Sequence, residues 1–303
     1  MWIFYSLIGA AGQAIQSAIK KKTLQASGMN NVIGFVSFMV AGLAFWLLYF
    51  MQSGALWWDG ELSVRFWQGM FWYAGLNVLA VYFAYKALDL AEFSYLMPFM
   101  TLTSVTVIVP AMIVFGEYPT IPDYIGIVLV VLGAILMNWK GGKGETKDEA
   151  SSRRSNRKGL WFFLITALCY TIAPTAAKVT IMESSVAFAS FLVHILIGIG
   201  FLVLVFLFGE KDRLREVFSP SKTVPRSFVF WVAIAGLIIA LENGAINTAL
   251  GMNDVVSVMA IKRLMPFFAF LIAFVYFRER TEIPKKLIAT ALMVAGAVLV
   301  TIW

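Results

Sequence analysis

Apolar residues recur along the chain in long blocks, which short polar stretches separate. A helix needs roughly 20 apolar residues to cross a bilayer core of about 30 Å. Runs such as IGIVLVVLGAIL lack the alternation of a transmembrane β-strand. The pattern therefore predicts an all-α integral membrane protein with ten transmembrane helices. The expected spans are Trp2–Ile19, Val32–Met51, Phe66–Tyr85, Phe93–Phe115, Tyr124–Trp139, Leu160–Ile181, Val186–Phe208, Phe228–Leu250, Val255–Phe277 and Lys286–Trp303.

Composition supports the membrane assignment. Hydrophobic residues make up 60% of the 303 residues and charged residues 14%, where a soluble domain has roughly 25% charged residues. This excludes a soluble enzyme, a disordered chain and a nucleic-acid-binding module, despite the net charge of +7. Cys169 is the single cysteine, so no intrachain disulfide is expected. Lysines follow the first apolar block instead of preceding it, which favours a first span over a cleaved signal peptide.

One stretch is strongly polar. Residues 140–158 read KGGKGETKDEASSRRSNRK, which is typical of a charged linker. It separates residues 1–139 from residues 159–303, and each of these halves holds five of the expected spans.

The basic residues predict an orientation. Of the 24 lysines and arginines, 20 lie in the linkers after odd-numbered spans. Arg65 lies in a linker after an even-numbered span. The other three, Lys178, Lys262 and Arg263, lie within spans. By the positive-inside rule those linkers are cytoplasmic. Both termini are then expected outside, with the 140–158 linker in the cytoplasm.

The two halves resemble each other. A unit of five spans is odd in number, so its copy enters the membrane upside down, and inverted repeats are a transporter architecture. We therefore expect two inverted five-helix repeats. Shifting the first half by 162 residues aligns Ala87 with Ala249, Glu92 with Asp254, Glu117 with Glu279 and Pro122 with Pro284, and a slightly smaller shift brings Lys20 over Lys178.

These repeated segments carry a family resemblance. The stretch from AYKALDL to the helix end VFGEYP, followed by the Gly-punctuated IGIVLVVLGAILM, resembles the end of an EamA-type domain of the drug/metabolite transporter superfamily. The second copy, from NTALGM onward, has Pro266 thirteen residues before Glu279, a usual place for the family's proline. The resemblance implies an alternating-access carrier of small metabolites.

Three charges fall deep within the predicted membrane segments. Glu242 and Lys262 each lie ten residues from the turn near Met252, which at 1.5 Å per residue places both roughly 15 Å deep. Arg263 follows directly. Such charges are costly in lipid, so they are expected to face the bundle interior or a wet cavity. They form either a structural ion pair or part of a substrate site.

The excess of positive charge favours an anionic solute. With Lys178, three cations stand against one carboxylate, and arginine suits a carboxylate or a phosphate. Lys178 either reaches the interface as a snorkelling side chain or shares a cavity surface with Tyr170. The sequence Ile261-Lys262-Arg263-Leu264 also resembles the Lys-Arg pair that phosphate translocators place in their ninth helix. That resemblance implies direct contact with a phosphate.

Further polar residues are weaker candidates. Asn243 and Asn247 share a helix face and either line the cavity or bond helix to helix. His194, the sole histidine, is either a packed side chain or a proton relay. Thr103 either lines a polar path or bonds a backbone carbonyl. Glu117 and Glu279 end their helices at the surface and are interpreted as structural or hinge residues.

No enzymatic motif, metal-ligand cluster or nucleotide-binding loop occurs, so no cofactor and no enzymatic activity are expected. The sequence predicts a secondary carrier in the cytoplasmic membrane for a small anionic or zwitterionic metabolite, driven by a coupling proton on Glu242 or His194 or by a counter-substrate. The partners are the solute and the lipid bilayer, with no nucleic acid, and the protein is a monomer or homodimer. The alternatives are an exporter of amino acids or apolar, drug-like compounds whose buried charges are structural, and a lipid-handling or scaffold protein.

Overall fold

The computed structural model describes residues 1–27, 29–91, 96, 103–138, 147–218, 226–275 and 283–302, and the regular elements there are all helical. The predicted all-α class is therefore confirmed for these residues. The helices are α1 (Trp2–Ser27), α2 (Asn30–Ser53), α3 (Val64–Leu90), α5 (Thr103–Thr106), α6 (Ile108–Phe115), α7 (Ile121–Asn138), α8 (Lys147–Met182), α9 (Val186–Leu207), α10 (Lys211–Phe218), α11 (Arg226–Met252), α12 (Val255–Lys262), α13 (Met265–Val275) and α14 (Ile283–Ile302).

The helices present apolar side chains outward as well as inward. Within the described ranges, four helical segments are long and apolar enough to cross a membrane, namely Asn30–Ser53, Arg157–Met182, Val186–Leu207 and Phe228–Met252. Leu43, Phe71 and Leu241 lie near the middle of their helices and are more than half exposed. Apolar surface of this extent is stable against lipid and is rare on soluble monomers.

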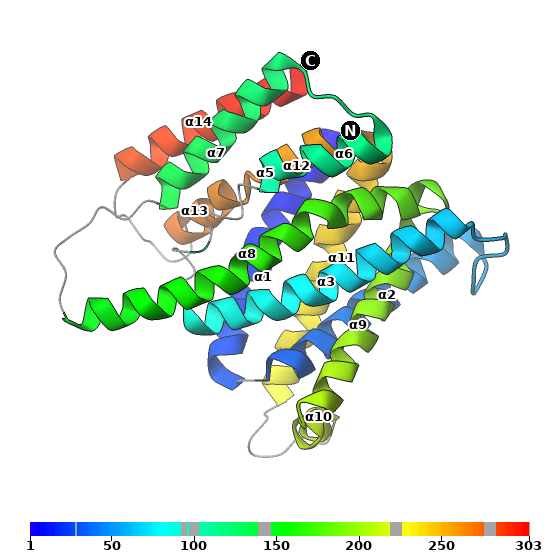
Figure 1. Cartoon of the computed structure of the whole chain (residues 1–303). Coiled ribbons are helices and arrows are strands. Elements are labelled where there is room, and N and C mark those ends of the chain that lie inside the picture. Colours follow the sequence, from blue (N-terminus) through cyan, green and yellow to red (C-terminus); the bar gives the residue numbers. More distant parts are fainter. Residues whose placement is uncertain are drawn as a thin grey trace.

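Helices from the two halves of the chain pack against each other. Figure 1 shows α3 beside α8, and α7 beside α14 at one edge of the bundle. The other principal contacts join α1 to α11 and α2 to α9. Phe66, Phe188 and Phe201 are fully buried in the largest apolar core. The core therefore forms between the halves, and neither half encloses it alone.

Two of the predicted spans are interrupted. Within 93–115 the described part divides into α5 and α6 at Val107, whose backbone stays helical, and within 255–277 a short turn at Arg263 and Leu264 separates α12 from α13. Each break comes shortly before a proline, Pro110 or Pro266, which lies in the first turn of the helix that follows. Proline lacks the N–H that an uninterrupted helix would use there, but that donor is not needed in a first turn.

The charged stretch between the halves is partly helical. Residues 139–146 lie outside the described residues, whereas α8 already begins at Lys147 and continues to Met182. Lys, Arg, Glu and Ala favour helix, which accounts for this extension of the span into the predicted linker.

The contact between α7 and α14 depends on small residues. A Cβ atom added to Gly126 would lie 2.6 Å from the carbonyl oxygen of Gly296, and one added to Gly133 would lie 2.7 Å from that of Ala289. Real Cβ atoms do not approach so closely, so the backbones would have to separate. Close approach through small residues is a common way for helices to associate in lipid.

We expect Gly126→Ala to lower the melting temperature of the detergent-purified protein, because overpacking typically costs about 1–3 kcal/mol. The matched control is Gly75→Ala on α3, where no atom lies within 4 Å of the added methyl group. Alanine favours helix over glycine, so the control should be neutral or slightly stabilising. Equal melting temperatures for the two variants would contradict the close α7–α14 contact.

Candidate functional site

An ion pair joins α11 to α12 inside the bundle. Lys262 Nζ lies 3.3 Å from Glu242 Oε1, and the Glu242 and Lys262 side chains are 5% and 12% exposed. Helix α1 covers this pair, because a Cβ atom on Gly12 would lie 3.1 Å from the Cβ of Glu242. The two charges that the sequence places at one depth are therefore direct partners.

Arg263 lies beside the pair, at the break between α12 and α13. Its residue is 5% exposed, and Nη2 donates a hydrogen bond to the Thr103 hydroxyl of α5. Arg263 Nε and Glu242 Oε2 are among the buried side-chain atoms that have no hydrogen-bond partner within the described residues. Buried polar atoms are normally bonded, so these two atoms mark the polar surface on which a ligand or water would be held.

The cluster of Glu242, Lys262 and Arg263, which we call the charged cluster, carries two cations and one carboxylate and so has a net charge of +1. Tyr170 of α8 is close enough to interact electrostatically with Glu242 and Arg263. The carbonyl groups at the C-terminal end of α12 add partial negative charge beside the two cations. The side chains of this polar surface therefore carry a net charge of +1, of which the end of α12 offsets a part.

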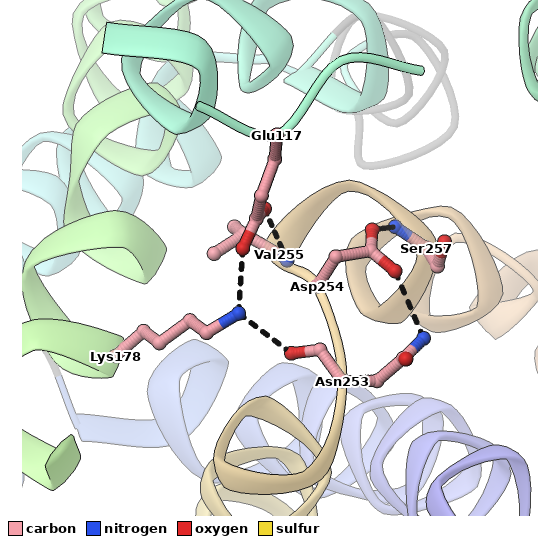
Figure 2. Close-up of polar contacts among 6 residues, drawn as sticks. All are labelled: Glu117, Lys178, Asn253, Asp254, Val255 and Ser257. Atoms are coloured by element: carbon pink, nitrogen blue, oxygen red, sulfur yellow. Dashed lines mark hydrogen bonds and ion pairs between the residues drawn. The ribbon is translucent and has the colours of Figure 1, made fainter. Parts of the chain in front are cut away.

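Lys178 belongs to a different group of charges. Figure 2 shows its ammonium group turned toward Glu117, which follows α6: Lys178 Nζ lies 2.5 Å from Glu117 Oε1 and donates to the Asn253 carbonyl at 2.9 Å. The structure does not place Lys178 with Tyr170 and the charged cluster. The sequence counted Lys178 with Lys262 and Arg263 against Glu242, which gives an excess charge of +2. Without Lys178 the excess charge of the cluster is +1.

The two asparagines of α11 make different contacts. Asn247 donates to Ser190 Oγ of α9 at 2.8 Å and exchanges hydrogen bonds with the Tyr73 hydroxyl of α3. Asn243 donates to the Ile239 carbonyl of its own helix at 3.1 Å. Asn247 therefore bonds α11 to α9 and α3, which is one of the two alternatives that the sequence left open.

His194 is packed in the apolar interior. It is 2% exposed, and Nδ1 lies 2.7 Å from the Ser190 carbonyl oxygen. The Phe38 and Phe45 rings lie within 5.9 Å and 4.9 Å of the imidazole ring, measured between centroids. These contacts account for the histidine as a packed, hydrogen-bonded side chain.

Sequence reasoning did not identify the partners of α5. Thr103 was one of several polar residues in its span, and only the fold shows that it bonds Arg263. Thr106 and Thr171 share a hydrogen bond of 2.7 Å, which ties α5 to α8. Threonine is common in membrane helices, so its spacing alone carried no signal. Glu279 lies outside the described residues, and no group of three or more metal-ligating side chains occurs within the described ones.

Comparison with known proteins agrees with the family resemblance of the sequence. The profile of the EamA-like transporter family matches residues 1–139 and 157–302. A solved structure, titled only as the crystal structure of a protein, superposes with a TM-score of 0.76 over 98% of both chains at 16% identity. That likeness shows a shared fold. A search of curated proteins gave no match.

The chain belongs to the EamA-like transporter family. Members of this family are membrane transporters of small molecules and not enzymes. Membership, together with the apolar helices, makes this chain a multi-pass membrane protein whose partners are a small solute and the lipid bilayer.

Removing either partner of the buried ion pair should destabilise the protein. We expect Glu242→Gln and Lys262→Met each to cost about 3–5 kcal/mol, because each leaves an unpaired charge in the interior. The double variant should lose clearly less than the sum of the two, as measured by thermal unfolding in detergent.

The comparison cycle uses Arg65→Met and Glu183→Gln. Their charges lie 3.8 Å apart at 56% and 26% exposure, so each change should cost under about 1 kcal/mol. Additive losses at Glu242 and Lys262 would show that the two side chains are not energetically coupled.

Proposed function

We propose that this transporter is a secondary active carrier that moves a small anionic or zwitterionic organic metabolite across the cytoplasmic membrane by alternating access. The observation that carries the proposal is the position of Arg263. It is buried at the break between two half-helices, and its Nε lacks a partner among the described residues. Broken helices of this kind form the substrate sites of several transporter folds.

The charge of the cluster favours an anion. Glu242 compensates Lys262, which leaves the guanidinium of Arg263 as the excess charge. A guanidinium presents parallel N–H groups that fit a carboxylate or a phosphate. The bond to Thr103 uses Nη2 and leaves Nε for a solute. For a zwitterion, Glu242 Oε2 would accept from the solute's cationic group.

The transport cycle that we propose depends on two inverted repeats of five spans each, ten in total. The family profile matches the two halves separately. The helix contacts support this repeat, because they keep their pattern when each helix is replaced by its counterpart in the other half. The contact of α3 with α8 then becomes that of α11 with α1. The pairs α2 with α9 and α7 with α14 each consist of two counterparts and therefore remain the same.

Coupling and orientation complete the proposal. Glu242 is the proposed proton-coupling residue, because protonating it would release Lys262 and change the charge that the solute meets. Alternatively, a counter-substrate anion that binds in exchange for the solute would drive the transport cycle. We propose that both termini lie outside, since the basic residues of the sequence are concentrated in the linkers after odd-numbered spans.

A second candidate function follows from the same contacts. Lys262 has a direct partner in Glu242 and Arg263 has one in Thr103, so the cluster can also be a scaffold that fixes α5, α11 and α12. The solute would then be an amino acid or an apolar, drug-like compound that binds elsewhere, and the protein would export it.

A ligand screen by thermal shift separates the two functions. The panel holds carboxylates, phosphorylated sugars, neutral and cationic amino acids and lipid headgroups. At 100 times its dissociation constant a ligand adds about 2.7 kcal/mol to the folded state, which raises the melting temperature. We expect stabilisation by one or more anions, loss of that stabilisation in Arg263→Ala, and its retention in Lys211→Ala, which removes an exposed cation of α10.

Stabilisation by cationic compounds alone, or by a neutral amino acid (a zwitterion at neutral pH) to an extent that Arg263→Ala does not diminish, would contradict the proposed site and favour the scaffold. Stabilisation by an anion that is undiminished in Arg263→Ala would place the anion elsewhere.

A further inference from the structure

A second group of charges, some of them partly buried, lies at the end of the bundle where α2, α6, α8 and α11 finish. The connections there carry Asp59, Glu61, Glu117, Glu183 and Asp254, and we call this the acidic end. Lys178 and Glu117 face each other there with their side chains 14% and 15% exposed. Neither residue belongs to the charged cluster, so the proposed solute site gives them no role.

Glu117 connects three parts of the chain. One oxygen accepts from Lys178 of α8 at 2.5 Å, and the other accepts the backbone N–H of Val255 at 2.8 Å. Glu117 itself follows α6, and Lys178 also donates to the Asn253 carbonyl (Figure 2). A single carboxylate therefore ties together the acidic ends of α6, α8 and α12.

The first turn of α12 makes this contact stronger. Asp254 caps the helix by accepting from the N–H of Ser257 at 2.7 Å, and Asn253 donates to the same carboxyl group at 2.9 Å. With Val255 bonded to Glu117, two carboxylates meet a helix end that carries partial positive charge. Charge-assisted hydrogen bonds of this kind are roughly twice as strong as neutral ones.

The ion pair of Arg65 and Glu183 at this end is longer and more exposed than that of Lys178 and Glu117. The charged atoms of Arg65 and Glu183 lie 3.8 Å apart, and the pair joins the start of α3 to the end of α8. Such surface pairs contribute little. The comparison shows that Glu117 and Lys178 are built as a specific connection and not as general surface charge.

The same elements lead to the charged cluster. α6 follows α5, which carries Thr103; α8 carries Tyr170; and the eight residues of α12 run from Val255 to Lys262. At a rise of 1.5 Å per residue, the seven steps from Val255 to Lys262 place the Glu117 contact and the charged cluster roughly 10 Å apart on one rigid element. Glu117 therefore holds together elements that reach from the charged cluster to the acidic end.

We propose that Glu117 and Lys178 form a gating latch that closes the acidic end and breaks when the carrier opens there. This rests on the proposed alternating-access function. In the structure the latch is made, and we assign this arrangement to the closed state of the acidic end. When it breaks, Glu117 and Lys178 become exposed to water, which lowers the cost of separating the charges.

Distances between spin labels test the latch without any solute. The labels are attached at Tyr118→Cys, next to Glu117, and Met252→Cys, at the end of α11, in a Cys169→Ala background. Tyr118 and Met252 are 74% and 53% exposed, whereas Cys169 is buried. Double electron–electron resonance then gives the distribution of label distances in nanodiscs.

In Glu117→Gln and in Lys178→Met we expect a second, longer-distance population that is absent, or far smaller, in the parent. Glu183→Gln, which breaks the exposed pair at the same end, should leave the distribution unchanged. Lys178→Arg keeps the charge and should also behave as the parent does. If Glu117→Gln does not fold, Lys178→Met alone decides, because it leaves the bond from Val255 to Glu117 in place.

Identical distributions in the parent, Glu117→Gln and Lys178→Met would overturn the latch. So would a longer population that appears equally in Glu183→Gln. These results are independent of the ligand screen, so the latch can fail while an anion still binds at Arg263. Conversely, the latch can hold in a protein whose solute proves to be neutral.

Discussion

The burial of charge among apolar helices is the constraint on which the rest of the structure depends. Glu242, Lys262 and Arg263 cannot face lipid without a large cost, so the helices that carry them must face one another. α1 approaches α11 closely enough at Gly12 to cover Glu242, and α5 supplies Thr103 to Arg263. The packing of α1 and α5 from the first half against α11 and α12 from the second encloses these groups.

The two ends of α12 place the functional groups. The interruption after α12 leaves Arg263 at a helix end, where it reaches across to α5. The other end of α12 is held by Glu117. Because one short helix carries both contacts, a solute that binds Arg263 and shifts α12 would act on the latch as well. The charged cluster and the latch are therefore mechanically coupled in the proposed cycle.

The sequence predicted the helical class and the membrane character, because apolar blocks of span length are a strong signal. It also placed Glu242 and Lys262 at one depth, since a hairpin fixes depth by counting residues from its turn. It left open whether Lys178 snorkels or faces the cavity, and the structure pairs it with Glu117. That contact joins residues 61 positions apart, which only tertiary packing determines. The bond of Thr103 to Arg263 was missed for the same reason.

The central claim is that the solute supplies the negative charge that the cluster lacks. Uptake of radiolabelled candidate solutes into proteoliposomes tests it most directly, because uptake is measured whether or not net charge crosses the membrane. An anion or a zwitterion should be taken up by the parent protein, Arg263→Ala should abolish that uptake, and Lys211→Ala should retain it. Uptake of cationic solutes alone, or anion uptake that is undiminished in Arg263→Ala, would contradict the account.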